Sequence, residues 1–134
     1  MLVDAEGITV VDWTGALLAD PAYDVAFTWL LLTHAPLEAP AALRTLIGVV
    51  SRRVGRSFLR QYRRRSPHIV TQASLDWHVG LHCLRTQIEV AGWVGAGDIG
   101  NKDGHPWLTN RAAFAQIVSE LTGVDVATPS TGRP

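Results

Sequence analysis

Two long stretches of this sequence repeat apolar residues at intervals of three and four, and they restrict the fold more than any other feature. The first covers about residues 41–65 and the second about residues 72–94. The apolar residues of the first stretch are Leu43, Leu46, Ile47, Val50, Val54, Phe58 and Tyr62, and those of the second are Trp77, Leu81, Leu84, Ile88 and Ala91. This period is that of an α-helix, so the sequence predicts two long helices. We expect the stripe of the second helix to face the core.

Two shorter helices are predicted from their end signals. Asp20-Pro21 combines an N-cap side chain with proline in the first helical position, so a helix should begin there. Its residues as far as Leu32 are apolar on nearly every side, which is typical of a helix in the middle of a domain. A last helix should run from about Thr109 to Thr122 and end at Gly123. The glycine-rich residues 95–106 are predicted to form a loop.

The N-terminal part of the chain has β-strand character. Met1 to Asp4 and Ile8 to Asp12 are short β-prone runs, and the three residues between them end in Gly7, which suits a hairpin turn. No alternation of strands and helices follows. We therefore predict a mainly α (α+β) chain with one N-terminal β-hairpin and about four helices, occupying residues 1–126, and a flexible tail over residues 127–134.

Composition limits the cellular context. The chain has 134 residues, of which 47% are hydrophobic and 18% charged, enough apolar material for one globular domain. Cys83 is the single cysteine, so no internal disulfide can form. The N-terminus carries Asp4 and Glu6 rather than positive charge, and no apolar run approaches the roughly 18 residues that span a bilayer. We expect a cytoplasmic protein with no membrane partner.

Arginine is concentrated in one segment. Residues 41–75 contain eight arginines and no acidic residue, whereas residues 1–40 contain six acids and no base. The cluster comprises Arg52, Arg53, Arg56, Arg60, Arg63, Arg64 and Arg65. It could bind nucleic acid or an acidic partner, but only Tyr62 is an interleaved aromatic residue and the total net charge is zero. A solvated helix face is the favoured interpretation, with no nucleic-acid partner.

Asp12 is the strongest candidate for a ligand of a metal ion. It ends the apolar run Ile8-Thr9-Val10-Val11, so a strand would hold its backbone while the carboxylate enters the following loop. Mg²⁺ prefers oxygen ligands and often takes only one or two protein carboxylates. The alternative is a carboxylate that caps the turn Trp13-Thr14-Gly15.

Further along, Asp20 has the simple role of an N-cap. Asp24 lies in the first turn of an apolar helix, where a carboxylate needs hydrogen-bond donors. We therefore expect Asp24 to anchor a neighbouring backbone segment.

The run Ile-Thr-Val-Val-Asp-Trp, a short loop and Ala-Asp-Pro-Ala-Tyr-Asp-Val-Ala resembles a pattern of the aminoglycoside phosphotransferase and choline kinase-like family. That pattern is an apolar strand, Asp-Trp and Gly-Asp-Pro-x-x-Asp-Leu-Ala, and the match is dense over about residues 1–32. The resemblance implies the C-terminal lobe of a protein kinase-like fold. It also implies that Asp12 matches the Asp-Phe-Gly aspartate, which binds the magnesium of ATP, and that Asp24 braces the catalytic loop. Ala19 replaces the usual glycine.

The same family places a loop of the form His-Gly-Asp-x-x-x-x-Asn before the hairpin, with the base and a second metal ligand. Met1-Leu2-Val3-Asp4 is similar to the strand that follows this loop, so we expect the chain to start just after the asparagine. The base, the asparagine, the nucleotide-binding lysine and the N-terminal lobe would then lie upstream of Met1. Mg²⁺ and ATP would be cofactors of the complete enzyme, and the isolated chain should bind them weakly and have no meaningful kinase activity.

The region of the second long helix helps to form the acceptor pocket in the family. By that resemblance Asp76, His82, Arg85 and Glu89 are weak candidates for substrate contacts. His78 and His82 are four residues apart, but no third metal ligand follows at a diagnostic spacing, so a polar helix face is favoured over a metal pair.

Gly95-x-Gly97-x-x-Gly100 has the form of a dinucleotide-binding loop, but it follows a predicted helix instead of a strand. We therefore do not interpret it as a phosphate-binding loop.

Two functions follow from the sequence. The first is part of an ATP-dependent small-molecule phosphotransferase, which transfers the γ-phosphate of ATP to a hydroxyl of an aminoglycoside-like or other metabolite. The second is a non-catalytic helical interaction module derived from the same fold. In either case, an apolar helix without its neighbours should expose an apolar patch and favour self-association.

Overall fold

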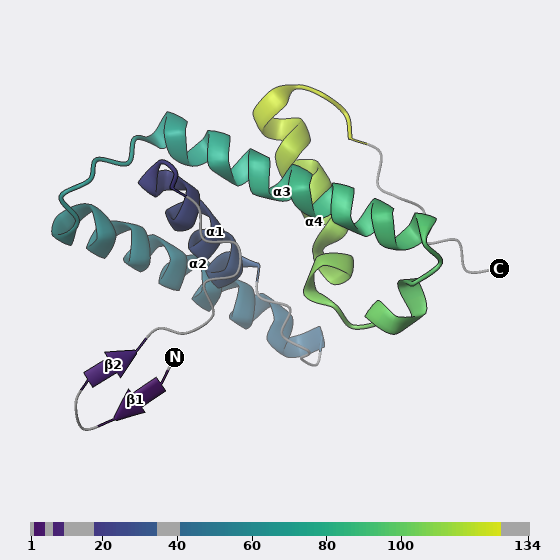
Figure 1. The fold of residues 1–134 in the computed structure, drawn as a ribbon, viewed down its shortest axis with the longest axis horizontal. Coiled ribbons are helices and arrows are strands. Elements are labelled where there is room, and N and C mark those ends of the chain that lie inside the picture. The colour runs from purple at the N-terminus through teal and green to yellow at the C-terminus, as the bar shows by residue number, and fades with distance from the viewer. Residues whose placement is uncertain (1, 5–6, 10–17, 35–40, 127–134) are drawn as a thin grey trace.

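The computed structural model describes residues 2–4, 7–9, 18–34 and 41–126, and these form a mainly helical chain (Figure 1). The helices are α1 (Pro21–Thr33), α2 (Ala41–Arg65), α3 (Gln72–Gly95) and α4 (Pro106–Thr122), with a short 3₁₀ helix, η1 (Ile99–Lys102), before α4. The strands β1 (Leu2–Asp4) and β2 (Gly7–Thr9) pair antiparallel, with Val3 opposite Ile8. The predicted α class is confirmed. The predicted tail at residues 127–134 lies outside the described residues.

The helix α1 packs between the two long helices α2 and α3 (Figure 1). It begins where the sequence predicts, because Asp20 is its N-cap and Oδ1 of Asp20 accepts a hydrogen bond of 2.8 Å from the amide of Ala22. Ala22 and Ala26 are fully buried, and their small side chains suit close contact with the neighbouring helices. The residues of α1 that enter the core are Ala22, Val25, Ala26 and Leu30. α1 thus joins α2 to α3, although its face with Phe27 and Leu31 is exposed.

Gly55 sets the close approach of α2 to α1. A Cβ atom at Gly55 would lie 2.5 Å from Cγ2 of Thr33 and 3.4 Å from Nε1 of Trp29. Non-bonded carbon atoms do not approach each other to 2.5 Å, so only glycine fits this position without movement of α1. On the same helix, Phe58, Leu59 and Tyr62 pack against the core.

The helix α4 packs against α3 and is also joined to the end of α1. Nε2 of Gln87 in α3 donates a 2.6 Å hydrogen bond to the carbonyl oxygen of Arg111 in α4, and Nδ2 of Asn110 donates one of 2.8 Å to the carbonyl oxygen of His34. On the two sides of the predicted loop, the rings of Trp93 in α3 and Trp107 in α4 stack with centroids 6.0 Å apart. These contacts close the turn between α3 and α4.

The start of α4 differs from the prediction, whereas its end agrees. The helix begins at Pro106, three residues before the expected Thr109, because Nδ1 of His105 accepts a hydrogen bond from the amide of Trp107 and so caps the helix. His105-Pro106 therefore repeats the arrangement of Asp20-Pro21. At the other end Gly123 has a φ of 72°, the left-handed conformation expected of a glycine after a helix.

The predicted core stripe of α3 is wrong. Trp77 and Ile88 are 71% and 65% exposed, and the other members of the stripe, Leu81, Leu84 and Ala91, are exposed as well. A different face of α3 is buried, and its residues are Leu75, Val79, His82, Cys83, Thr86, Gln87 and Val90. Because this helix carries apolar residues on two faces, its period alone could not show which face meets α1 and α4. None of the helices in the described part of the chain is long and apolar enough to cross a membrane.

Candidate functional site

The contact between α1 and α3 brings together three of the polar residues that the sequence singled out, Asp20, His82 and Arg85. Its centre is Tyr23, whose carbonyl oxygen lies 2.9 Å from Nε2 of His82. The rings of Tyr23 and His82 are 4.3 Å apart between centroids, and NH1 of Arg85 donates a 3.1 Å hydrogen bond to the Tyr23 hydroxyl. At the start of α1, the Ser74 hydroxyl donates to Oδ2 of Asp20 over 3.3 Å. The start of α1 is therefore held on α3 by several hydrogen bonds.

His82 is a buried histidine in this contact. Burial lowers the pKa of His82 below its usual value, and the nearby positive charge of Arg85 acts in the same direction. The hydrogen bond to the Tyr23 carbonyl and the charge of Asp24 oppose this shift without cancelling it. His82 is thus neutral near pH 7, with its Nε2 hydrogen donated to α1.

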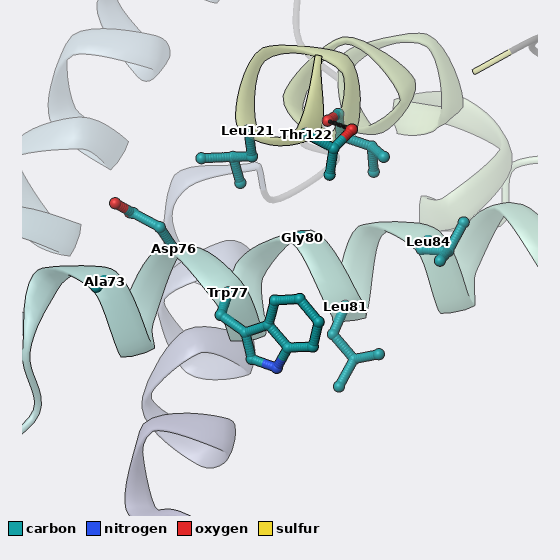
Figure 2. Close-up of a pocket in the computed structure, with 9 residues that line it drawn as sticks. Ala73, Asp76, Trp77, Gly80, Leu81, Leu84, Leu121 and Thr122 are labelled. Carbon is teal, nitrogen blue, oxygen red and sulfur yellow. Dashed lines mark hydrogen bonds between the residues drawn. The ribbon is translucent and has the colours of Figure 1, made fainter. Parts of the chain in front are cut away.

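A groove with a volume of about 590 Å³ lies between α3 and α4 (Figure 2). Its walls are mostly apolar, and the carboxylate of Asp76 stands at one end of it. Oδ1 of Asp76 accepts a 2.7 Å hydrogen bond from Nε2 of Gln72. The residues of α3 and α4 that line the groove are Ala73, Asp76, Trp77, Gly80, Leu81, Leu84, Val118, Leu121 and Thr122. Its size is that of a small-molecule site.

The four candidate substrate residues do not form one pocket. Asp76 lines the groove between α3 and α4, whereas His82 is buried against α1 and Arg85 binds the Tyr23 hydroxyl. Glu89 is half-buried further along α3. The helix therefore divides these residues between two faces, and only His82 and Arg85 meet at a common residue, Tyr23.

Of the residues assigned to the metal and its support, the structure describes two. Asp12 lies outside the described residues. Asp20 is confirmed as the N-cap of α1. Asp24 is exposed, because the buried face of α1 points the other way, and within residues 18–34 and 43–126 no donor forms a hydrogen bond with it. Its bracing role stays a prediction.

A second groove, of about 650 Å³, runs along α2 and is strongly basic. Four arginines line it, together with Leu59 and Gln72, and these arginines are Arg53, Arg56, Arg60 and Arg63. NH2 of Arg63 donates a 3.2 Å hydrogen bond to Oε1 of Gln72. The sequence indicated the basic helix, but it could not show that Gln72 of α3 closes the groove.

The remaining candidates have structural surroundings. His78 Nδ1 lies 2.8 Å from the carbonyl oxygen of Ser74, so both histidines of the pair face backbone carbonyls. In the part of the chain that the structure describes, no three side chains of metal-ligand type converge. Cys83 is fully buried, and burial raises the pKa of its thiol to about 12. Gly95 ends α3, and Gly97 with its φ of 69° lies in the turn that follows, so this glycine run does not connect a strand to a helix.

Neither a protein-family model, nor a curated protein, nor a solved structure matches this chain.

Proposed function

We propose that this chain is the C-terminal part of an ATP-dependent small-molecule phosphotransferase that resembles the aminoglycoside phosphotransferase and choline kinase-like enzymes. The observation that carries the proposal is the placement of the Asp20-Pro21-x-x-Asp24 segment. It begins α1, is capped by Asp20, and lies between α2 and α3 directly after the segment that contains Asp12. A helix held in this way would fix the position at which the Asp12 loop enters the helical part.

In this proposal Asp12 would hold Mg²⁺, which neutralises charge on the phosphates of bound ATP and orients them for transfer. The residues of the described helices have positioning roles. Asp20 sets the first turn of α1 and holds Ser74, while His82 and Arg85 hold Tyr23 two residues after Pro21. Together they keep the start of α1 in one place on α3, and positioning of this kind contributes strongly to phosphoryl transfer.

The exposed stripe of α3 fits the proposal because it leaves apolar surface for further parts of a larger enzyme. Trp77, Leu81, Leu84 and Ile88 are all exposed and lie on one face of the helix. Contiguous apolar surface of this kind marks an interface. The same stripe is the observation that favours the second candidate, a non-catalytic interaction module, since it could equally receive a partner protein.

The coding DNA upstream of Met1 distinguishes the two candidates. The first predicts an in-frame sequence that encodes His-Gly-Asp-x-x-x-x-Asn shortly before Met1. An in-frame stop codon directly upstream would refute the phosphotransferase proposal for this chain and favour the interaction module.

A further inference from the structure

The basic groove on α2 is the feature that the proposed function leaves unexplained. Arg53, Arg56, Arg60 and Arg63 follow one another at steps of 3, 4 and 3 residues, so they lie on one face of the helix. The first and the last are ten residues apart, which corresponds to about 15 Å along an α-helix at about 1.5 Å per residue. The groove thus presents a row of four guanidinium groups along its length.

These guanidinium groups have no carboxylate partner among the described residues, where the one ion pair joins Lys102 to Asp98. Arg63 reaches the neutral side chain of Gln72, and Arg56 donates from Nε to the backbone oxygen of Arg52 over 3.3 Å. Two of the described acids lie at this end of α3, and neither is paired with an arginine: Asp76 accepts its hydrogen bond from Gln72, and Asp20 accepts from Ser74 and the amide of Ala22. Like charges at three- and four-residue spacing on a helix repel each other, so a bound anion would stabilise this arrangement.

The shape and the lining of the groove narrow the class of anion. The groove is shallow and open to solvent, and its volume of about 650 Å³ is within the range of small-molecule sites. Its lining contains no aromatic residue, the type of side chain on which proteins that bind single-stranded nucleic acid stack successive bases. Arginine presents several N–H groups in a plane and binds phosphate oxygens in pairs.

We infer that this groove binds a short chain of linked phosphates through Arg53, Arg56, Arg60 and Arg63. The arginines contact the phosphate oxygens along the row, and Gln72 holds Arg63 in place at one end. This inference does not depend on the proposed function, and the ligand is recognised by phosphate alone.

The test uses inorganic tripolyphosphate as the probe and isothermal titration calorimetry of the full chain at low salt. The first variant is Arg60→Gln/Arg63→Gln, which removes two groove arginines. The matched control is Arg64→Gln/Arg65→Gln, which changes the net charge equally at the same end of α2 but outside the groove lining. Circular dichroism of both variants checks that the helices are retained.

The site predicts saturable binding of one tripolyphosphate. Each charged hydrogen bond is worth enough that loss of two groove arginines should weaken binding by at least about tenfold, against less than about threefold for the control. ATP should bind no more tightly than tripolyphosphate, because the base makes no contribution. Orthophosphate should bind much more weakly, because it spans too little of the row.

Several results would overturn the site. An equal loss in both double variants would show diffuse attraction to the basic helix, and absence of saturable tripolyphosphate binding would remove the site altogether. Much tighter binding of ATP would show that a base is recognised. Binding of single-stranded DNA or of phosphatidylglycerol vesicles without binding of tripolyphosphate would assign the arginines to a macromolecular surface instead.

Discussion

Replacement of Gly55 by alanine tests the packing of α1 between its neighbours. The new Cβ atom would lie 2.5 Å from Cγ2 of Thr33, about 1 Å closer than ordinary van der Waals contact allows. Thr33 cannot easily move aside, because its hydroxyl donates a 2.8 Å hydrogen bond to the carbonyl oxygen of Trp29. Such overpacking costs typically about 1–3 kcal/mol, whereas alanine gains about 1 kcal/mol over glycine in a helix. The expected net change in the free energy of unfolding is a loss of about 0–2 kcal/mol.

Gly48→Ala in the same helix is the matched control. A Cβ atom there meets only the end of the Arg52 side chain, at 3.6 Å, so this variant should gain the helix propensity of alanine without a clash. Urea unfolding followed by circular dichroism should therefore place Gly55→Ala about 1–3 kcal/mol below Gly48→Ala. Thr33→Ser removes Cγ2 and keeps the hydroxyl, so it should recover much of this loss in combination with Gly55→Ala. Equal stability of the two alanine variants, or no recovery by Thr33→Ser, would refute the close contact of α1 and α2.

Three further predictions concern the same helices. Asp20→Ala removes the cap of α1 and the partner of Ser74 and should lower the free energy of unfolding by about 1 kcal/mol in urea titrations, whereas no change would contradict the capping role. Burial holds the pKa of His82 below its unfolded value, so the native state resists protonation. The free energy of unfolding should therefore be constant above pH 6.5 and fall as the pH decreases below 6.5. His82→Gln should flatten this pH dependence in unfolding experiments from pH 5 to 8, and an unchanged slope would contradict the role of His82. Ile88→Gln should reduce self-association in sedimentation velocity, while Val124→Gln, also exposed but outside the stripe of α3, should leave it unchanged; a monomeric unmodified chain would contradict this prediction.

The ends of the helices were the part of the fold most readily predicted from the sequence. Asp20-Pro21 and Gly123 act through local backbone geometry, which depends on neighbouring residues alone, so α1 begins and α4 ends at the expected places. His105-Pro106 carries the same kind of signal, but it directly follows a glycine-rich stretch whose composition predicts a loop as far as residue 106. Histidine is also a less familiar N-cap than aspartate.

The orientation of α3 could not be predicted, because it depends on which neighbours are present. Both the stripe that contains Trp77 and the face that contains Val79 have helical spacing, and the structure buries the second. The buried face includes His82, Thr86 and Gln87, which donate hydrogen bonds to backbone oxygens within α3 and on α1 and α4. Among the described residues, Oε1 of Gln87 has no hydrogen-bond partner. Because the helical period is identified from apolar residues alone, a face that carries three polar residues is predicted to be exposed.

The candidate site was predicted in part. The sequence singled out Asp20, His82 and Arg85, and the structure places all three at the contact between α1 and α3. The sequence does not indicate that Tyr23 contacts both His82 and Arg85. These residues are 59 and 62 positions away from Tyr23 in the chain, and the packing of α1 on α3 brings them together. The basic groove likewise required the position of Gln72 relative to α2.

We propose that Asp12 binds the magnesium ion of a phosphotransferase. The most direct test is transfer of radiolabelled γ-phosphate from ATP to a panel of hydroxylated acceptors by the chain expressed together with any in-frame coding sequence that precedes Met1. The account predicts Mg²⁺-dependent transfer that falls at least about a hundredfold in Asp12→Asn and is unchanged in Asp125→Asn, with no transfer by the isolated 134-residue chain. Full activity of Asp12→Asn, or stoichiometric transfer by the isolated chain, would contradict it.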